Sequence, residues 1–235
     1  VGALLLFAPA GVLVAAVLTT VAGGSAFLMG GHFFDHWNLV DLTYRGLWTP
    51  VGFVRNLFLD GWNPFFPWFG LYTLGLLVGR LDLRNRSVRR RLLLAGAASA
   101  AAASAASEMW APELLLTVRP GHLLMTTATP PTPAFVVYAG GLALAVIMIS
   151  TTIAERYARA VAPLVAAGQL ALTLYLAHVF VGLGALESMG YMEGQSLPFA
   201  VGAALAFFGI ATAVSWAWRK RFSRGPLEAL MRAVS

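Results

Sequence analysis

The sequence contains no cysteine and very little charge. Without cysteine the chain cannot form disulfides, thiolate metal ligands or a cysteine nucleophile. Only 11% of its 235 residues are charged and 59% are hydrophobic, whereas a soluble domain has about 25% charged residues. So few charges cannot cover a folded surface with polar groups, and so many apolar residues exclude disorder. The composition therefore indicates an integral membrane protein whose main partner is a lipid bilayer.

The beginning of the sequence lacks charge as well. The chain opens at Val1 inside an apolar run, and its first basic residue is Arg45. A secretory signal would begin with basic residues and end at a small-residue cleavage site. We therefore expect this sequence to continue a longer protein and to lack its N-terminal helices.

Long apolar runs are what the sequence has in abundance. A helix that crosses about 30 Å of hydrocarbon needs roughly 20 mostly apolar residues. Six runs approach this length, at residues 2–22, 65–81, 92–106, 135–153, 164–184 and 198–218. The third consists of Ala, Gly and Ser and predicts a helix packed closely among others, as does the GLLVG pattern at 75–79. The fold class is all-α, a single polytopic transmembrane bundle over 1–235 with about six spans.

The basic residues give this bundle an orientation. Six arginines lie at the end of the second span and before the third, two lie after the fourth, and five basic residues follow the sixth. Thus 13 of the 16 basic residues fall on one side, which is cytoplasmic by the positive-inside rule. Cytoplasmic loops are expected at about 82–91, 154–163 and 219–235, and outer loops at about 23–63, 107–133 and 185–197. The basic clusters act as topology signals or bind a polyanion, and no recognition module for nucleic acid is present.

The outer loops hold several polar candidates. In the first, His32 and His36 are four residues apart with Asp35 between them, a spacing that can hold a metal, but no third ligand follows at a diagnostic distance. We therefore expect no metal and a hydrogen-bonding role for these histidines. In the second, Arg119 either clamps an anionic substrate or pairs with a nearby glutamate.

The fifth span carries the densest set of polar residues, in GQLALTLYLAH at 168–178. On a helix, Gln169 and Thr173 share one face, while Tyr175 and His178 share another. Counted from a start near residue 164 at 1.5 Å per residue, His178 lies about 21 Å across the membrane. A histidine in the outer half can exchange a proton near neutral pH, so His178 is either a general base or a packed histidine.

Three segments together resemble one family. They are GWNPFFPWFGLYTLGLLVGRLDLRNRSVRRRLLL (61–94), LVAAGQLALTLYLAHV (164–179) and RFSRGPLEALMRAV (221–234). Their Pro-Trp, Gly-Arg-Leu-Asp-Leu-Arg, Ala-Leu-Thr-x-Tyr and Gly-Pro-Leu-Glu elements are similar to those of heparan-α-glucosaminide N-acetyltransferase-like, or YeiB-like, bacterial membrane proteins. The family's early Asp-x-x-Arg-Gly helix has no match here.

The resemblance implies a transmembrane acyltransferase of about ten helices in a bacterial cytoplasmic membrane, with a cytoplasmic C-terminus. It would move an acetyl group from cytosolic acetyl-CoA to a sugar or lipid-linked acceptor. The histidine that the family uses lies in the early region that has no match here, so His178 is only the best base candidate among the residues present. Four arginines are the candidates for holding the acyl-CoA: Arg80, Arg84, Arg89 and Arg90. Six residues would line the acceptor site: Trp62, Trp68, Arg119, Gln169, Thr173 and Tyr175.

Two other classes remain open at this point. A non-catalytic membrane subunit of a larger complex, or a homodimer, would also explain the Ala-rich third span. A transporter or flippase would predict an inverted repeat, and none is convincing between the two halves of the sequence.

Overall fold

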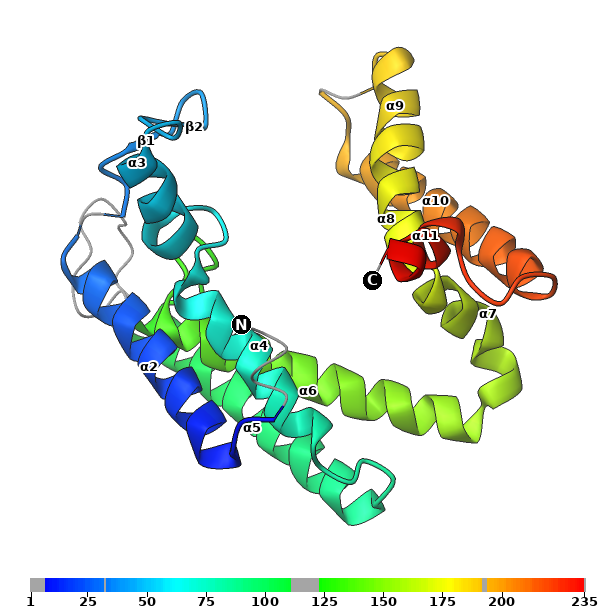
Figure 1. The fold of residues 1–235 in the computed structure, drawn as a ribbon, viewed down its shortest axis with the longest axis horizontal. Helices are drawn as coiled ribbons and strands as arrows, with labels where there is room; N and C mark the ends of the chain where they lie inside the picture. The colour runs from blue at the N-terminus through cyan, green and yellow to red at the C-terminus, as the bar shows by residue number, and fades with distance from the viewer. Residues whose placement is uncertain (1–6, 32, 111–122, 192–193, 235) are drawn as a thin grey trace. The chain divides into compact units, whose positions relative to one another are not determined.

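The computed structural model describes residues 7–31, 33–110, 123–191 and 194–234 (Figure 1). It is helical with one very small hairpin, and the chain divides into two compact units, Val1–Ser150 and Thr151–Ser235. Within the described residues, five helical segments are long and apolar enough to cross a membrane. The prediction of an all-α membrane bundle is therefore confirmed.

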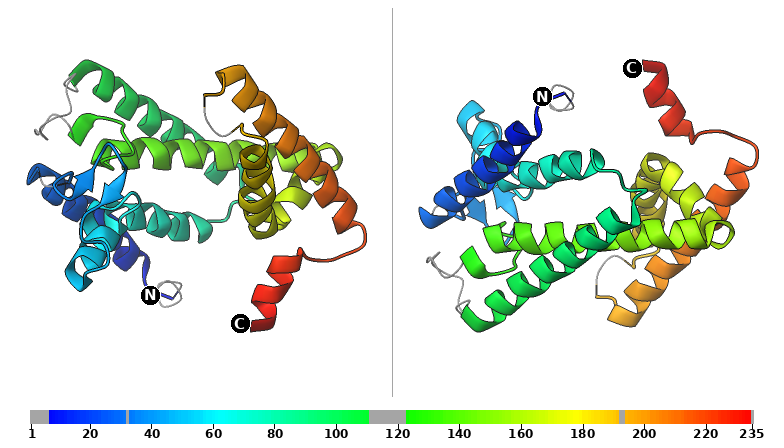
Figure 2. Two further views of the ribbon diagram at one scale, coloured as in Figure 1. Left: turned by 90° about the horizontal axis from the view of Figure 1, so that it is seen from above. Right: turned by 90° about the horizontal axis from the view of Figure 1, so that it is seen from below.

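The first unit begins with an antiparallel pair of helices, α2 (Ala10–Met29) and α4 (Phe65–Gly79), which pack along one another (Figure 2). Gly70 makes this approach possible, because a Cβ there would lie 3.0 Å from the Thr20 hydroxyl oxygen. At one end of the pair Arg80 donates a hydrogen bond to the carbonyl of Ala8 (2.6 Å). The loop that connects α2 to α4 therefore leaves from the opposite end of the pair.

Helix α4 is short for a span, since its 15 residues extend only about 22 Å. The glycines of its GLLVG segment make no close contact in the described part of the chain, because a Cβ on Gly75 or Gly79 would meet nothing within 4 Å. The prediction of close packing at this pattern was wrong. The pattern shows only that two small residues share a helix face, and the contact to α2 uses Gly70, one turn earlier.

The third and fourth spans are α5 (Arg86–Trp110) and α6 (Pro133–Arg156). They meet through glycine, as the small residues of the third span predicted. A Cβ on Gly96 would lie 2.6 Å from the Gly141 carbonyl oxygen, so only glycine allows the backbones to approach this closely. Helix α5 starts six residues earlier than expected and takes the arginine cluster into its first turns.

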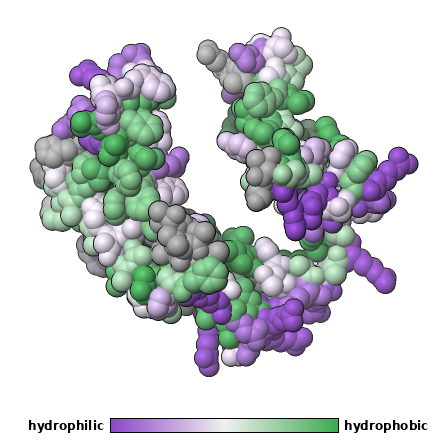
Figure 3. All heavy atoms as spheres, viewed as in Figure 1, coloured by the Kyte–Doolittle hydropathy of each residue, from purple (hydrophilic) through white to green (hydrophobic). Residues whose placement is uncertain are grey.

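The loop between α2 and α4 forms a small substructure. Strands β1 (Trp37–Asn38) and β2 (Thr43–Tyr44) pair antiparallel, with Trp37 opposite Tyr44. A helix, α3 (Pro50–Arg55), continues as a π-helical turn, η1 (Asn56–Asp60). Hydrophilic residues gather at both ends of the first compact unit, and apolar residues lie between them, as expected for a membrane protein (Figure 3).

The second unit contains the last two apolar segments and the tail. The expected fifth span is broken at Leu170 into α7 (Ala158–Gln169) and a continuous stretch of α8 (Ala171–Ala177), η3 (His178–Leu183) and α9 (Gly184–Ser188). The sixth span is α10 (Leu197–Arg219), which packs against α7, and the tail forms α11 (Pro226–Val234). Residues 164–169 thus belong to a separate helix, and the span proper starts at Ala171.

Candidate functional site

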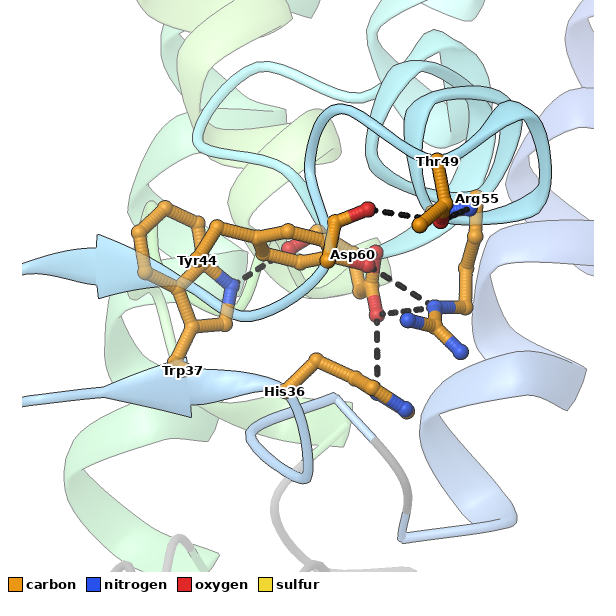
Figure 4. Close-up of polar contacts among 8 residues, drawn as sticks. His36, Trp37, Tyr44, Thr49, Arg55 and Asp60 are labelled. Atoms are coloured by element: carbon orange, nitrogen blue, oxygen red, sulfur yellow. Dashed lines mark hydrogen bonds and ion pairs between the residues drawn. The ribbon is translucent and has the colours of Figure 1, made fainter.

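Asp60 is the centre of a polar cluster in the loop between α2 and α4 (Figure 4). It is the last residue of η1, and its side chain is 0% exposed. The next residue, Gly61, must be glycine, because a Cβ there would lie 2.3 Å from the Asn56 carbonyl oxygen. A buried carboxylate is costly unless it is paired and hydrogen-bonded, so the partners of Asp60 define the cluster.

Three side chains satisfy most of this carboxylate and its backbone. The Tyr44 hydroxyl donates to Asp60 Oδ1 (2.7 Å), and Arg55 Nε lies 3.3 Å from Asp60 Oδ2. Arg55 Nε also donates to the Tyr44 hydroxyl oxygen (2.8 Å). The Trp37 indole donates to the Asp60 carbonyl oxygen (2.6 Å). We call His36, Trp37, Tyr44, Arg55 and Asp60 the Asp60 cluster.

The cluster keeps Tyr44 protonated. Burial raises the pKa of the Tyr44 hydroxyl, Arg55 opposes this by hydrogen bonding, and the Asp60 carboxylate raises the pKa further. The net pKa lies above the ordinary value, which is about 10. Tyr44 is therefore a proton donor to Asp60 throughout the neutral range.

His36 is a member of the cluster whose ring is partly exposed. Its Nδ1 lies 3.7 Å from Asp60 Oδ2, and neither atom has a hydrogen-bond partner among the described residues. The side chain is 34% exposed, so one edge faces the carboxylate while part of the ring is accessible. A carboxylate behind an imidazole orients the ring. This arrangement suits His36 for taking up a proton.

An aromatic pocket adjoins the Asp60 cluster. Its volume is about 620 Å³, and two cluster members, Trp37 and Tyr44, lie on its wall. The remaining wall combines two more tryptophans with small polar side chains: Trp48, Trp62, Thr43, Thr49 and Asn56. Trp37 packs edge to face on Trp62 at 4.9 Å, whereas Trp48 is 90% exposed and stands at the rim. Aromatic walls with a few polar groups are typical of small-molecule sites.

The possible metal site of the sequence consists of His32 and His36. His32 lies outside the described residues, so the His32–His36 spacing remains a prediction. The described residues contain no group of three His, Asp or Glu side chains that could hold a metal. His36 pairs with Asp60 instead of Asp35.

The acceptor residues predicted in the fifth span are dispersed by the break at Leu170. Gln169 ends α7, Thr173 lies in the first turn of α8, and Tyr175 is 65% exposed. His178 is exposed and packs edge to face against Phe207 at 5.5 Å. Since the span starts at Ala171, His178 lies about 10 Å along it, not 21 Å. His178 as a base remains a prediction.

Thr173 is held by the tail. Its backbone N–H donates to Glu228 Oε1 (3.1 Å), and its hydroxyl donates to Glu228 Oε2 (2.5 Å). The Leu227 N–H donates back to the Thr173 hydroxyl oxygen (3.2 Å). The first N–H groups of a helix have no partner within it, so Glu228 caps α8 from 55 residues away. We call this contact the tail clasp.

The clasp explains why two of the sequence motifs occur together. Thr173 belongs to the Ala-Leu-Thr-x-Tyr element, whereas Gly225 and Glu228 belong to Gly-Pro-Leu-Glu. A Cβ on Gly225 would lie 2.1 Å from Glu228 Oε2 and 2.8 Å from the Thr173 hydroxyl oxygen, so glycine is needed there. Burial raises the pKa of Glu228, but the Thr173 hydrogen bonds outweigh it and the net pKa is lowered. Glu228 is therefore an anion at neutral pH.

The other predicted residues lie in the first unit. Trp62 lines the aromatic pocket, while Trp68 packs against Phe135 at 5.6 Å. Arg80 binds the Ala8 carbonyl, and Arg84 and Arg90 are exposed. Arg89 is only 5% exposed and lies within the bundle. Arg119 lies outside the described residues.

Sequence reasoning missed the Asp60 cluster as a unit. Asp60 lies in the loop expected at about 23–63, and its partners come from three separate elements. The unusual density of Trp, Tyr, His and Asp in a loop this long was the available signal.

Taken together, the apolar helices and the polar ends define a multi-pass helical membrane protein. Residues 78–235 match the model of the family described as "Protein of unknown function (DUF418)", which is the YeiB-like family. The chain belongs to this family. No curated protein and no solved structure matches the chain. The matched part contains the tail clasp, whereas the Asp60 cluster lies before it.

Proposed function

We propose that the chain is part of a membrane-embedded acyltransferase that moves an acyl group from a cytosolic acyl-CoA to a sugar or lipid-linked acceptor. The observation that carries this proposal is the His36–Asp60 pair beside the aromatic pocket. The pocket offers flat tryptophan faces for the rings of a sugar, and Thr43 and Asn56 offer hydrogen bonds to its hydroxyl groups. The resemblance of three motifs to the acetyltransferase-like family supports the same reaction class.

The proposed chemistry assigns a proton to His36. An acceptor amine or hydroxyl attacks the thioester carbonyl carbon, the carbon–sulfur bond breaks, and coenzyme A leaves. The accessible edge of His36 takes the proton of the attacking group, while Asp60 stabilises the resulting imidazolium. Arg55 and Tyr44 hold Asp60 in place. General-base catalysis of this kind contributes about 10²–10⁴-fold in rate.

The donor is proposed to bind at the other end of the α2–α4 pair. Arg80, Arg84 and Arg90 remain candidates for its phosphates, since all three are exposed. Arg89 is buried and is better suited to support the bundle than to contact a ligand. An acyl-CoA in the cytosol would meet this end first if the basic residues are cytoplasmic.

Radiolabelled acetyl-CoA tests the reaction directly. The purified full chain in proteoliposomes is supplied with labelled acetyl-CoA outside and a panel of amino sugars and lipid-linked sugars inside. We expect His36→Gln to lower kcat by 10²-fold or more and His178→Gln to leave it within about twofold. The reverse result would assign the base to His178.

A matched pair of tryptophans tests the acceptor site. Trp48→Ala should raise the KM for the acceptor, because Trp48 stands on the pocket rim. Trp110→Ala should not, because Trp110 is 62% exposed on α5 and does not line the pocket. If the wild type transfers no label to any acceptor, binds no acyl-CoA and copurifies with other subunits in fixed stoichiometry, the protein is a non-catalytic subunit instead.

A further inference from the structure

A second pocket lies in the second unit, between α7 and the end of α10. It is an open groove of about 410 Å³. Its floor consists of alanine and valine side chains: Ala154, Ala158, Val161, Ala162, Val165 and Ala166. The groove therefore offers an apolar channel at a place where a membrane helix ends.

The charged residues that line the groove are both basic, Arg219 and Lys220. The Lys220 ammonium lies 3.5 Å from the ring centroid of Trp216, which also lines the groove. Arg219 is held through Nη1 by the carbonyl oxygens of Phe222 and Ser223. A guanidinium carries five N–H donors, so this anchoring fixes the group in place and uses only part of its capacity.

Residues that flank the groove in the sequence add positive charge. Arg156 and Arg159 flank the start of α7, and Arg221 and Arg224 follow α10, while Glu155 is the acidic residue next to the floor. Basic pockets between membrane helices attract anionic headgroups, and each basic residue near the membrane surface contributes about fivefold in affinity. Trp216 near the helix end is also typical of the interface between hydrocarbon and water.

We propose that this groove binds an anionic phospholipid, with an acyl chain along the alanine and valine floor and the phosphate between Arg219 and Lys220. A water-soluble anion would gain nothing from the apolar floor. A zwitterionic lipid would place its ammonium group beside two cations. The groove lies away from the Asp60 cluster in the chain, so the proposal does not depend on acyl transfer.

Native mass spectrometry of the full chain, released from nanodiscs of mixed phosphatidylglycerol and phosphatidylcholine, counts retained lipids. We expect the wild type to retain phosphatidylglycerol selectively, and the Arg219→Gln/Lys220→Gln double variant to lose roughly 25-fold in that preference. The matched control, Arg221→Gln/Arg224→Gln, removes the same charge outside the groove and should lower the preference much less than the groove pair does. Ala162→Phe fills the floor without changing charge and should also displace the lipid.

The outcomes separate specific from general binding. Equal losses in the two charge variants, or retention in Ala162→Phe, would overturn the proposal in favour of diffuse surface attraction. Displacement of the lipid by added coenzyme A in the wild type, with loss of coenzyme A binding in the groove variants, would overturn it in favour of a donor site. Because Arg219 also anchors the chain after α10, the Lys220→Gln single variant and thermal unfolding of each variant check that the unit remains folded.

Discussion

Removing the Glu228 carboxylate should release the tail from the fifth span. In the clasp this group accepts hydrogen bonds from the backbone N–H and the hydroxyl of Thr173. Hydrogen bonds to charged groups contribute about 1.5–3 kcal/mol each when buried. The clasp is half-buried, so we expect about 2 kcal/mol for the pair, which is roughly a 30-fold change in the opening equilibrium.

Hydrogen exchange measures this opening directly. In Glu228→Ala, the Thr173 amide and the amides of α11 should exchange roughly 30-fold faster than in the wild type. Glu187→Ala, which removes an exposed carboxylate from α9, should leave them unchanged. A Thr173→Val and Glu228→Gln double-mutant cycle should give a coupling energy of about 1–2 kcal/mol. Unchanged protection in Glu228→Ala would refute the clasp.

The clasp should also depend on pH in one direction. Because the pKa of Glu228 is lowered in the folded protein, its stabilisation is fully present above the unfolded value of about 4.3. It is lost only as the pH falls through the lower folded value. The absence of cysteine allows a single nitroxide at Met231→Cys to report this. Its mobility should stay constant from pH 7 to 5 and rise below about pH 4; a rise near pH 6 would contradict the assignment.

Three further predictions follow from close contacts. Gly225→Ala should mimic loss of the clasp in the same exchange assay, because its Cβ would lie on the carboxylate. Gly96→Ala should lower the thermal unfolding midpoint clearly, because its Cβ would meet a carbonyl oxygen of the facing helix at 2.6 Å, whereas Gly75→Ala should not. Tyr44→Phe should cost about 1–2 kcal/mol in unfolding free energy, because Asp60 loses a buried donor, and an unchanged midpoint would show that water replaces the hydroxyl.

The hydropathy of the sequence was sufficient for the fold class. Apolar runs and small residues reflect local requirements of a helix in lipid, so α2, α6, α10 and the glycine contact at Gly96 could be predicted. The break at Leu170 was not predicted, because residues 164–184 together are long and apolar enough to be read as one span despite Gly168 and Gln169 just before the break. Its capping group lies 55 residues later in the chain, beyond any local pattern.

The candidate site was predictable only as a composition. Trp62 lines the aromatic pocket, and its motif drew attention to it in the sequence, but its role in binding an acceptor remains a prediction. The pairing of His36 with Asp60 depends on how a hairpin and a π-helical turn meet, and residue spacing in a loop does not encode that. The sequence also contained no sign that Arg89 differs from the arginines around it. Its arginine neighbours are exposed, and only the helix phase of α5 turns it inward.

The tail clasp has a consequence for how the protein is made. Thr173 leaves the ribosome 55 residues before Glu228, and α10 is synthesised between them. The first turn of α8 therefore lacks its cap until α10 has been inserted and the chain has returned to the same side. Truncation before Glu228 would leave that helix start without its cap even though α10 had been synthesised.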